Sequence, residues 1–322
     1  MTIVNPPAKV LVTGANGYIA VWICRILLEK GYSVRGTVRT PSKGDYLKKL
    51  FEKEGERFEY VLVEDITAEG AFDEAVKGVQ GVLHTASPVA MAIKHPDELI
   101  KPAVQGTLSV LTSVDKYGTE VGRVVITSSC AAILEPHEGG YVYTEKDWND
   151  FSLHEVEQKS EKAAPIHQYR TSKTLAEQNA WRFEKEKTGK WDLVTILPPY
   201  VFGPLLQETA GKDSLNFSAQ LIYDAVVTPK TGEALYSYAG KLEEAGGERI
   251  IVSAGYFAWQ DLYDALSSPS LDPPFPDAPK GSSERGAPLI YSGDLCNKLF
   301  GIGFRGLRES ARDTVFSVRE RH

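Results

Sequence analysis

The sequence predicts an α/β protein built on a doubly wound parallel sheet, with a smaller C-terminal lobe interleaved with it. Two observations indicate this fold class. Over the first 130 residues, short apolar runs alternate with amphipathic stretches, as expected for repeated strand–helix crossovers. Beyond Pro204 the alternation becomes irregular. We therefore expect one domain over residues 1–198 and a smaller lobe over 199–322, some of whose segments return to the sheet.

Apolar runs and glycine stops define the individual elements. KVLVTG (9–14) is a buried strand, and YIAVWICRILLEKG (18–31) is a helix that Gly31 ends. Further strands are expected at residues 32–39, 58–65, 81–87, 123–129 and 191–199. Further helices are expected at residues 42–54, 69–77, 97–117, 166–188 and 306–321. The polar segment 135–164 and the Pro-, Ser- and Gly-rich segment 267–288 are expected to be loops.

The composition excludes several classes of protein. An apolar content of 42% and a charged content of 25% are typical of a soluble globular chain, and a net charge of −7 disfavours nucleic-acid or anionic-membrane binding. No run approaches the roughly 20 apolar residues of a membrane span, and the N-terminal run is too short for a signal peptide. Three separated cysteines and six scattered histidines indicate neither a disulfide framework nor a metal site. We expect a cytoplasmic, metal-free protein.

A glycine-rich turn joins the first strand to the first helix. In TGANGYIA, Gly14 and Gly17 allow a tight turn and close backbone approach, and the helix begins with Tyr18 and Ile19. Backbone N–H groups at a helix start, helped by the helix dipole, can hold a pyrophosphate. The strand–turn–helix context favours a dinucleotide site in a Rossmann-type sheet over a glycine turn without a ligand. No Gly-Lys-Ser/Thr follows, so the turn is not a P-loop.

The end of the second strand indicates which dinucleotide binds. An NAD site usually has an acidic residue there, whereas NADP needs a cation for its 2′-phosphate. Here the strand ends at Arg39, Lys43 lies just beyond, and no acid occurs before Asp45. NADP(H) is therefore the expected cofactor. The alternative is that Arg39 binds no phosphate and is simply a solvated arginine on a loop. Residues after the third and fourth strands are expected near the adenine and the ribose: Asp65, Ile66, Thr85, Ala86 and Ser87.

Three residues form a candidate catalytic set. Tyr169 and Lys173, in HQYRTSKTLAEQ, share a helix face. An ammonium group lowers the pKa of a tyrosine from its usual value near ~10, so Tyr169 can protonate a carbonyl oxygen while NADPH delivers hydride to the carbon. Ser129, at the end of RVVITSS, can hydrogen-bond that carbonyl. Taken singly, the tyrosine–lysine spacing also fits a solvated helix face, and Ser129 also fits a strand cap.

Seven motifs occur in the order seen in extended short-chain dehydrogenases/reductases: VLVTGANGYIA, VRGTVR, VLHTASP, VVITSSCAA, YRTSK, LPPYVFGP and FRGLRESARDTV. The chain resembles the branch with dihydroflavonol reductases, cinnamoyl-CoA reductases and fungal NADPH-dependent aldehyde/ketone (carbonyl, methylglyoxal-type) reductases. This resemblance implies that Ser129, Tyr169 and Lys173 are the catalytic triad, and that Arg39 and Lys43 bind the 2′-phosphate. It also places residues 198–201, with Pro198 and Val201, against the nicotinamide. The implied partner is a small-molecule carbonyl substrate, and either a monomer or a homodimer is expected.

Two departures from the family pattern narrow the expected substrate. Leu134 stands where plant dihydroflavonol reductases carry a polar residue, and PIHQYRTSK differs from the cinnamoyl-CoA reductase signature around the catalytic tyrosine. The nearest resemblance is therefore to the fungal aldehyde/ketone reductases. An apolar substrate pocket is expected, although its members fit ordinary core positions equally well: Val89, Ile133, Leu134 and Phe202.

A third departure concerns the stretch before GGERIIVSAG, which lacks the acidic strand–helix unit of the family. The chain is then a shortened variant or an incompletely predicted coding sequence. The leading hypothesis is NADPH-dependent reduction of an aldehyde or ketone to an alcohol. The alternatives are a non-catalytic NADP-binding regulator, a shortened inactive homologue, a dihydroflavonol or cinnamoyl-CoA reductase, and a sugar-nucleotide epimerase. Arg39 disfavours the epimerase, because those enzymes mostly hold NAD.

Overall fold

The computed structural model describes residues 4–88, 95–209, 215–221, 246–267, 289–301 and 304–319. The chain divides into two compact units. The first comprises Met1–Pro136, Lys146–Leu197 and Glu243–Ile250, and the second comprises His137–Glu145, Pro198–Leu242 and Ile251–His322. Val89 and residues 268–288 of the expected loop lie outside the described residues.

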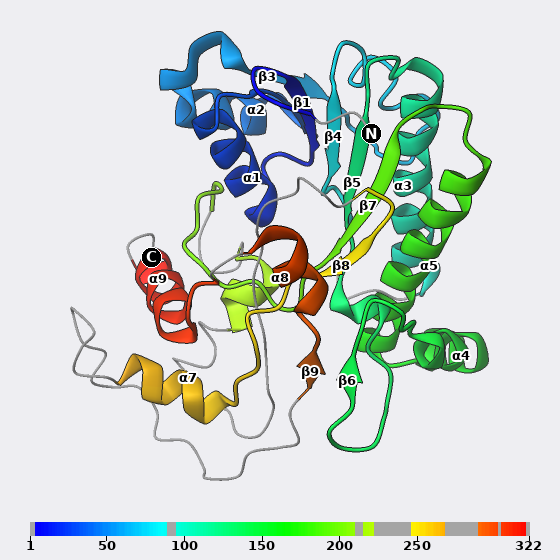
Figure 1. Ribbon diagram of the computed structural model, residues 1–322, viewed down its shortest axis with the longest axis vertical. Coiled ribbons are helices and arrows are strands. Elements are labelled where there is room, and N and C mark those ends of the chain that lie inside the picture. Colours follow the sequence, from blue (N-terminus) through cyan, green and yellow to red (C-terminus); the bar gives the residue numbers. More distant parts are fainter. Residues whose placement is uncertain are drawn as a thin grey trace. The chain divides into compact units, whose positions relative to one another are not determined.

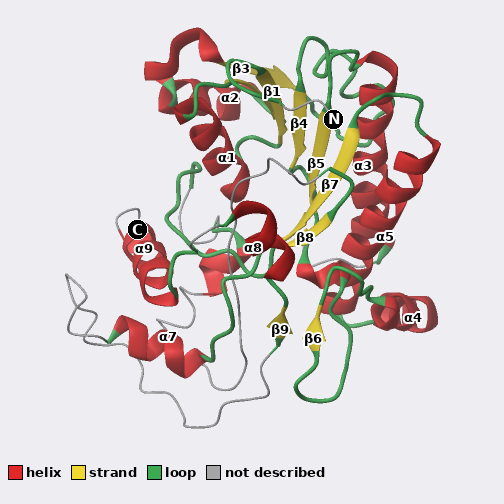
Figure 2. Cartoon of the chain, in the orientation of Figure 1, coloured by secondary structure: helices red, strands yellow, loops and turns green. Residues whose placement is uncertain are grey.

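A seven-stranded sheet in the order β3-β2-β1-β4-β5-β7-β8 confirms the predicted fold class (Figures 1 and 2). Its strands are β1 (Lys9–Thr13), β2 (Ser33–Val38), β3 (Phe58–Leu62), β4 (Gly81–His84), β5 (Arg123–Thr127), β7 (Asp192–Leu197) and β8 (Arg249–Ile251). The pairings from β3 to β7 are all parallel. The strand order reverses between β1 and β4, and open α/β sheets bind ligands beyond the carboxyl ends of strands at such a point.

Helices cover both faces of the sheet. α1 (Tyr18–Glu29) and α2 (Pro41–Leu50) lie on one face, and α3 (Asp97–Tyr117) packs with α5 (Pro165–Glu186) on the other (Figure 1). The core on the α3 side is apolar and fully buried, with Leu11, Phe72, Val110, Leu111 and Leu193 among its members. Burial on both faces explains why the strands read as continuous apolar runs. No helix in the described part of the chain is long and apolar enough to cross a bilayer.

The second unit is built from short elements. β6 (Val142–Tyr143) pairs in parallel with β9 (Ile290–Tyr291). α7 (Trp259–Leu266) packs against α9 (Leu307–Arg319), and α8 is formed by Asp294–Phe300. The core of this unit contains Phe202, Phe257, Leu262, Tyr263, Leu266, Ala311 and Val315.

The helix predicted over 69–77 is wrong, because this segment forms successive turns. Gly70 adopts a left-handed φ of +72°. The Arg35 guanidinium donates to the carbonyls of Ala75 and Lys77, at 3.0 and 2.7 Å. In a helix, these carbonyls would accept from the N–H groups of residues further along the chain. Because they accept from Arg35 instead, the segment does not need to be helical. Phe72 is nevertheless fully buried, so the apolar spacing was real while the backbone conformation differed.

The loop predicted over 135–164 is also wrong in part, because α4 (Asp150–Lys159) lies within it. The side chain of Asn149 caps this helix by accepting the N–H of Ser152 at 2.9 Å. Ser152 is the only residue of α4 that is buried. A helix with so narrow a buried face gives a weak apolar periodicity, and for that reason its sequence resembled a polar loop.

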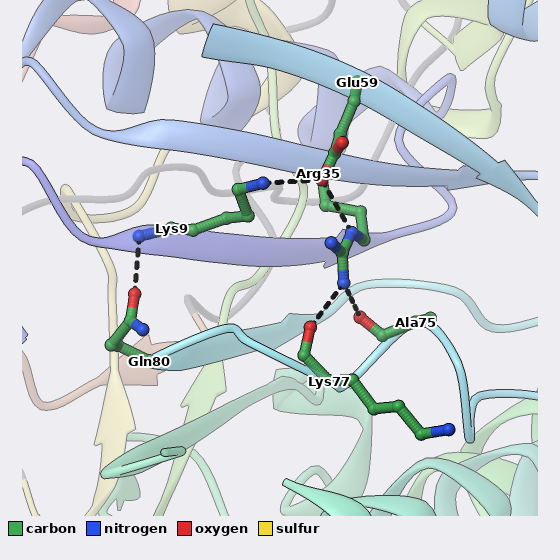
Figure 3. Close-up of polar contacts among 6 residues, drawn as sticks. All are labelled: Lys9, Arg35, Glu59, Ala75, Lys77 and Gln80. Carbon is green, nitrogen blue, oxygen red and sulfur yellow. Dashed lines mark hydrogen bonds and ion pairs between the residues drawn. The ribbon is translucent and has the colours of Figure 1, made fainter.

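A charged cluster joins three strands and the turns that follow (Figure 3). Arg35 on β2 lies opposite Glu59 on β3. The Glu59 carboxylate accepts from Arg35 Nε at 2.8 Å and from Lys9 Nζ at 2.9 Å. Partial burial acts to raise the pKa of Glu59, but these two cations hold it below its ordinary value. Arg35 therefore donates to three acceptors, of which Glu59 also has Lys9 as a donor.

Arg35→Met is expected to lower the free energy of unfolding by about 2–3 kcal/mol, because partly buried acceptors lose their donor. Arg25→Met is the matched control, since Arg25 forms an exposed pair with Glu29 on one helix, worth roughly 0.5 kcal/mol or less. Urea unfolding of both variants measures the difference. An equal loss in the two variants would contradict this role of Arg35.

Candidate active site

The glycine-rich turn is closely packed against the end of β4. Gly14 has a φ of +63°, and a Cβ at this position would lie 3.1 Å from the Cα of Ala86. The N–H of Gly17 donates to the Gly14 carbonyl at 2.8 Å. Gly17 is also the N-cap of α1, where no side chain caps the helix. The turn thus leaves the start of α1 open to a ligand, as a pyrophosphate site requires.

Thr13 joins the carboxyl ends of β1 and β4. Its Oγ1 accepts from the N–H groups of Thr85 and Ala86, both at 3.1 Å, and lies 2.9 Å from Nδ1 of His84. Because Thr13 Oγ1 already accepts two hydrogen bonds, its own proton is donated to Nδ1 of His84. His84 is therefore neutral, in the tautomer whose Nδ1 is the acceptor. Burial, with the nearby charge of Lys173, lowers the pKa of His84 to about 3. This contact fixes the predicted ribose-side residues against the glycine turn.

Two cations lie at the end of β2, where a 2′-phosphate is expected. The Arg39 side chain is exposed, and within the described residues no hydrogen bond or ion pair engages its guanidinium. Lys43 is in the first turn of α2, whose N-cap is Thr40. The Thr40 and Ser42 hydroxyls are 3.1 Å apart. Two cations, two hydroxyls and a helix N-terminus form a set of groups that suits a phosphate.

Asp65 and Ile66 follow β3 and differ in exposure. Asp65 is exposed, and its Oδ1 accepts from the hydroxyl and the N–H of Thr67 at 2.7 and 2.8 Å. These bonds, more than the charge of Arg39, hold the pKa of Asp65 below its ordinary value. Ile66 is partly buried and packs against α3, where a Cβ on Gly106 would come within 2.7 Å of it. Only part of Ile66 is therefore available to a ligand.

Lys173 is buried at the centre of the candidate site. Its side chain reaches from α5 to the segment after β4, where Nζ lies 2.9 Å from the Ser87 hydroxyl oxygen. Nζ is also 5.7 Å from the ring centroid of Tyr169. Burial lowers the pKa of Lys173 to about 8. The structure thus brings Tyr169, Lys173 and Ser87 together, although they are separated by up to 86 residues.

Ser129 follows β5 in an extended conformation and begins a short 3₁₀ turn, Cys130–Ala132. Its Oγ accepts the N–H of Ala131 at 3.1 Å, so the hydroxyl proton can be donated elsewhere. Ile133 is fully buried and Leu134 is half-buried. Of these two predicted substrate residues, only Leu134 has an exposed surface that a substrate could contact.

Asn149 holds the turn that follows Ser129. Its Nδ2 donates to the carbonyls of Ala131 and Leu134 at 3.0 and 2.7 Å, and its side chain is fully buried. Through its cap on Ser152 it also begins α4, and the Ser152 carbonyl accepts from Thr171 of α5 at 2.9 Å. The Ser129 turn and the helix that carries Tyr169 are therefore linked through α4.

The remaining predicted residues belong to the second unit. Pro198 is buried and Val201 is half-buried. Phe202 is 3% exposed and packs edge-on against Phe257 in the core of that unit. The sequence left open whether Phe202 contacts substrate or is an ordinary core residue. Its burial supports the core role.

A family model described as "NAD dependent epimerase/dehydratase family" matches residues 10–233. This chain belongs to that family. As an extended short-chain dehydrogenase/reductase it has the family membership that the motifs implied.

Among its relatives in this family are two fungal reductases. Ketoreductase azaE of Aspergillus niger is 34% identical over 97% of this chain and 98% of its own. NADPH-dependent methylglyoxal reductase GRE2 of Saccharomyces cerevisiae is 33% identical over 96% of this chain and 98% of its own. The crystal structure of yeast methylglyoxal/isovaleraldehyde reductase Gre2 complexed with NADPH superposes with a TM-score of 0.85, at 30% identity, covering 97% of this chain and 98% of that chain.

The two sequence alignments are longer than this chain. Both sequence alignments extend over 340 positions, more than the 322 residues of this chain. They therefore contain positions where these family members have a residue and this chain has none. That the missing positions form a strand–helix unit before residue 246 stays a prediction. The stretch in question, before residue 246, lies largely outside the described residues.

Sequence reasoning missed several residues that position the family's motifs, notably Thr13, Asn149 and Glu177. Each is buried and polar. Asn149 and Glu177 lie in stretches rich in polar residues, which a pattern of hydrophobicity assigns to the surface. The neighbouring Asp150 and the helical run after it gave the one usable signal for Asn149, since Asn is favoured at helix N-caps.

Lys173→Met is expected to stabilise the coenzyme-free protein by about 1–3 kcal/mol at pH 7, because a buried ammonium is removed. The folded-state pKa of about 8 lies below the unfolded value of about 10.4, so the penalty is full below pH 8 and disappears as the pH rises to about 10.4. Thermal unfolding at pH 7 and pH 10 measures this change.

The matched control is Lys185→Met, which removes an exposed lysine from the same helix and is expected to change the thermal midpoint little at either pH. A stabilisation by Lys173→Met that is equal at the two pH values would show that the buried charge is not its cause.

Proposed function

We propose that this chain is an NADPH-dependent reductase that converts an aldehyde or a ketone into an alcohol. The observation that carries the proposal is the buried Lys173, with Nζ 5.7 Å from the ring of Tyr169 and 2.9 Å from Ser87 at the end of β4. A solvated helix face would leave such a lysine exposed. The named functions of the relatives, a ketoreductase and an NADPH-dependent methylglyoxal reductase, support the same reaction class.

The first unit is the proposed NADP-binding domain. Its glycine turn fits a dinucleotide, because Gly17 at the N-cap leaves the first N–H groups of α1 without a side-chain cap. Arg39 and Lys43 are the proposed ligands of the 2′-phosphate, and the start of α1, at Tyr18, faces the pyrophosphate in this assignment. When bound, NADPH supplies hydride to the carbonyl carbon.

Tyr169 is the proposed proton donor to the carbonyl oxygen. The charge of Lys173 favours the tyrosinate that remains after proton transfer, and so lowers the energy of that step. The free hydroxyl proton of Ser129 is donated to the carbonyl oxygen, which orients the substrate and stabilises the charge that develops there. No metal is needed in this scheme, because the polarising groups are side chains.

The proposed substrates are small apolar aldehydes and ketones. Leu134, half-buried beside the Ser129 turn, presents no hydrogen-bonding group to a polyhydroxylated ring. The second unit is the proposed substrate-binding lobe. A cytoplasmic location and a monomeric or homodimeric state remain predictions from the sequence.

Tyr169→Phe is expected to lower kcat for carbonyl reduction by on the order of 10²–10⁴-fold while leaving NADPH binding unchanged, because only the proton donor is lost. NADPH consumption is followed with a panel of aldehydes, ketones and diketones, and Tyr117→Phe, an exposed tyrosine, is the control. Turnover that survives in Tyr169→Phe would refute this assignment. NADPH binding without turnover by the parent protein would instead support a non-catalytic regulator.

Arg39→Gln is expected to weaken NADPH binding by about 10–100-fold, the effect of losing one or two charge-assisted hydrogen bonds, and to leave NADH binding nearly unchanged. Fluorescence titration of both coenzymes measures the two dissociation constants. Lys49→Gln removes an exposed cation from α2 and controls for net charge. Equal weakening of NADPH and NADH would exclude Arg39 as the 2′-phosphate ligand.

A further inference from the structure

Glu177 is a buried carboxylate on the helix that carries Tyr169 and Lys173. It is 1% exposed and lies one turn beyond Lys173 on α5. Its oxygens accept from Ser128 Oγ at 2.6 Å, Thr195 Oγ1 at 2.8 Å and Arg249 Nε at 2.7 Å. These three donors come from the end of β5, from β7 and from β8. One side chain of α5 is therefore bonded to three places in the sheet.

Of these three donors, Ser128 is the one next to a candidate catalytic residue, because it immediately precedes Ser129 in the chain. Its N–H donates to the Ile196 carbonyl of β7 at 2.8 Å, and its hydroxyl donates to Glu177. Both its backbone and its side chain are thus held. In an extended chain, successive side chains point to opposite sides. Fixing Ser128 toward α5 therefore sets the direction of the Ser129 side chain.

The Ser128–Glu177 bond also sets a distance. Tyr169 and Glu177 belong to one continuous helix, α5, so they move together. Ser128 and Ser129 are adjacent in the chain. A short bond between Ser128 and Glu177 therefore limits how far the Ser129 hydroxyl can shift along the helix that bears Tyr169. Thr195 has an equivalent bond to the same carboxylate, but it lies within β7 and has no candidate catalytic neighbour.

We propose that Ser128 and Glu177 are positioning residues that hold the Ser129 hydroxyl in register with Tyr169. The inference rests on the proposed function, in which those two groups act on one carbonyl oxygen. Positional errors of about 1 Å in such a set can reduce turnover by up to ~100-fold, so a bond that adds little to overall stability can matter for kcat.

The test compares two variants that each remove one hydroxyl from the same carboxylate. Ser128→Ala and Thr195→Val are used because substituting Glu177 itself would leave the partly buried Arg249 without its carboxylate and risk unfolding. Both variants are expected to lower the thermal midpoint by similar amounts. Ser128→Ala is expected to reduce kcat about tenfold with NADPH binding unchanged, whereas Thr195→Val is expected to change kcat less than about twofold. Equal kcat losses would overturn the proposal.

A double-mutant cycle separates positioning from a general structural effect. If Ser128 acts through Ser129, adding Ser128→Ala to Ser129→Ala is expected to cause no further loss of kcat. The same tenfold loss in both backgrounds would show that Ser128 acts in another way, and would refute the inference.

A readout independent of activity is hydrogen exchange of the peptide that covers residues 129–134. We expect faster exchange in Ser128→Ala than in the parent protein, and exchange like the parent in Thr195→Val. Unchanged exchange in Ser128→Ala overturns the inference, even where the parent reduces no carbonyl compound. Absence of turnover by the parent counts against the proposed function alone, so the two failures are distinguishable.

Discussion

The contact on which the first unit depends is the ion pair between the buried Glu177 and the partly buried Arg249. Arg249 Nε donates to Glu177 at 2.7 Å, across 72 residues of sequence. Arg249 also stacks on the Trp148 ring at 3.5 Å and donates to the Asp147 carbonyl at 2.8 Å. Helix α5, strand β8 and the segment that leads into α4 are thereby joined at one point. A buried carboxylate is tolerated only when its oxygens have donors, so these elements require one another.

Lys173, one turn away on the same helix, is buried without such a counter-charge among the residues that the structure describes. Glu177 is paired with a cation, whereas the contact made by Lys173 Nζ to a polar side chain is with the neutral hydroxyl of Ser87. Desolvation is therefore the cause of its lowered pKa. The fold therefore buries one charged ammonium group, that of Lys173 beside Tyr169, at a cost in free energy. Such local destabilisation is common where chemistry requires a perturbed group, and it is sustained by well-satisfied contacts elsewhere.

Much of the fold could be predicted because its signals are local. The glycine turn, the apolar strands and the helix from Asp97 to Tyr117 each depend on residues close in sequence. The carboxyl ends of parallel strands meet at one edge, so the approach of Ser87 to Lys173 could be expected from topology. The segment 69–77 could not, because Arg35 on a distant strand determines which partners its carbonyls have.

The positioning residues were beyond sequence reasoning for a related reason. Ser128 and Glu177 are 49 residues apart, and Asn149 lies 15 to 18 residues from the carbonyls it holds. Apart from the preference of Asn for helix N-caps, the sequence does not distinguish a buried, paired polar residue from one on the surface, since both interrupt the apolar pattern in the same way. Burial of polar groups is decided by partners that only the folded chain supplies.

The residues from Gly246 onward contact the rest of the first unit directly, although the sequence predicts that a strand–helix unit is missing before them. β8 is in place beside β7, with the Gly247 N–H donating to the Leu193 carbonyl at 2.9 Å and the Thr195 N–H donating to the Glu248 carbonyl at 3.1 Å. Gly246 lies against the Arg123–Asp192 ion pair so closely that a Cβ would meet Asp192 Oδ2 at 2.4 Å. From Gly246 onward the chain is therefore fitted to the sheet, and Arg249 reaches Glu177. The described contacts that fix Ser128, Ser129 and Lys173 are made by α5 and by the segments after β4 and β5, outside the stretch before Gly246.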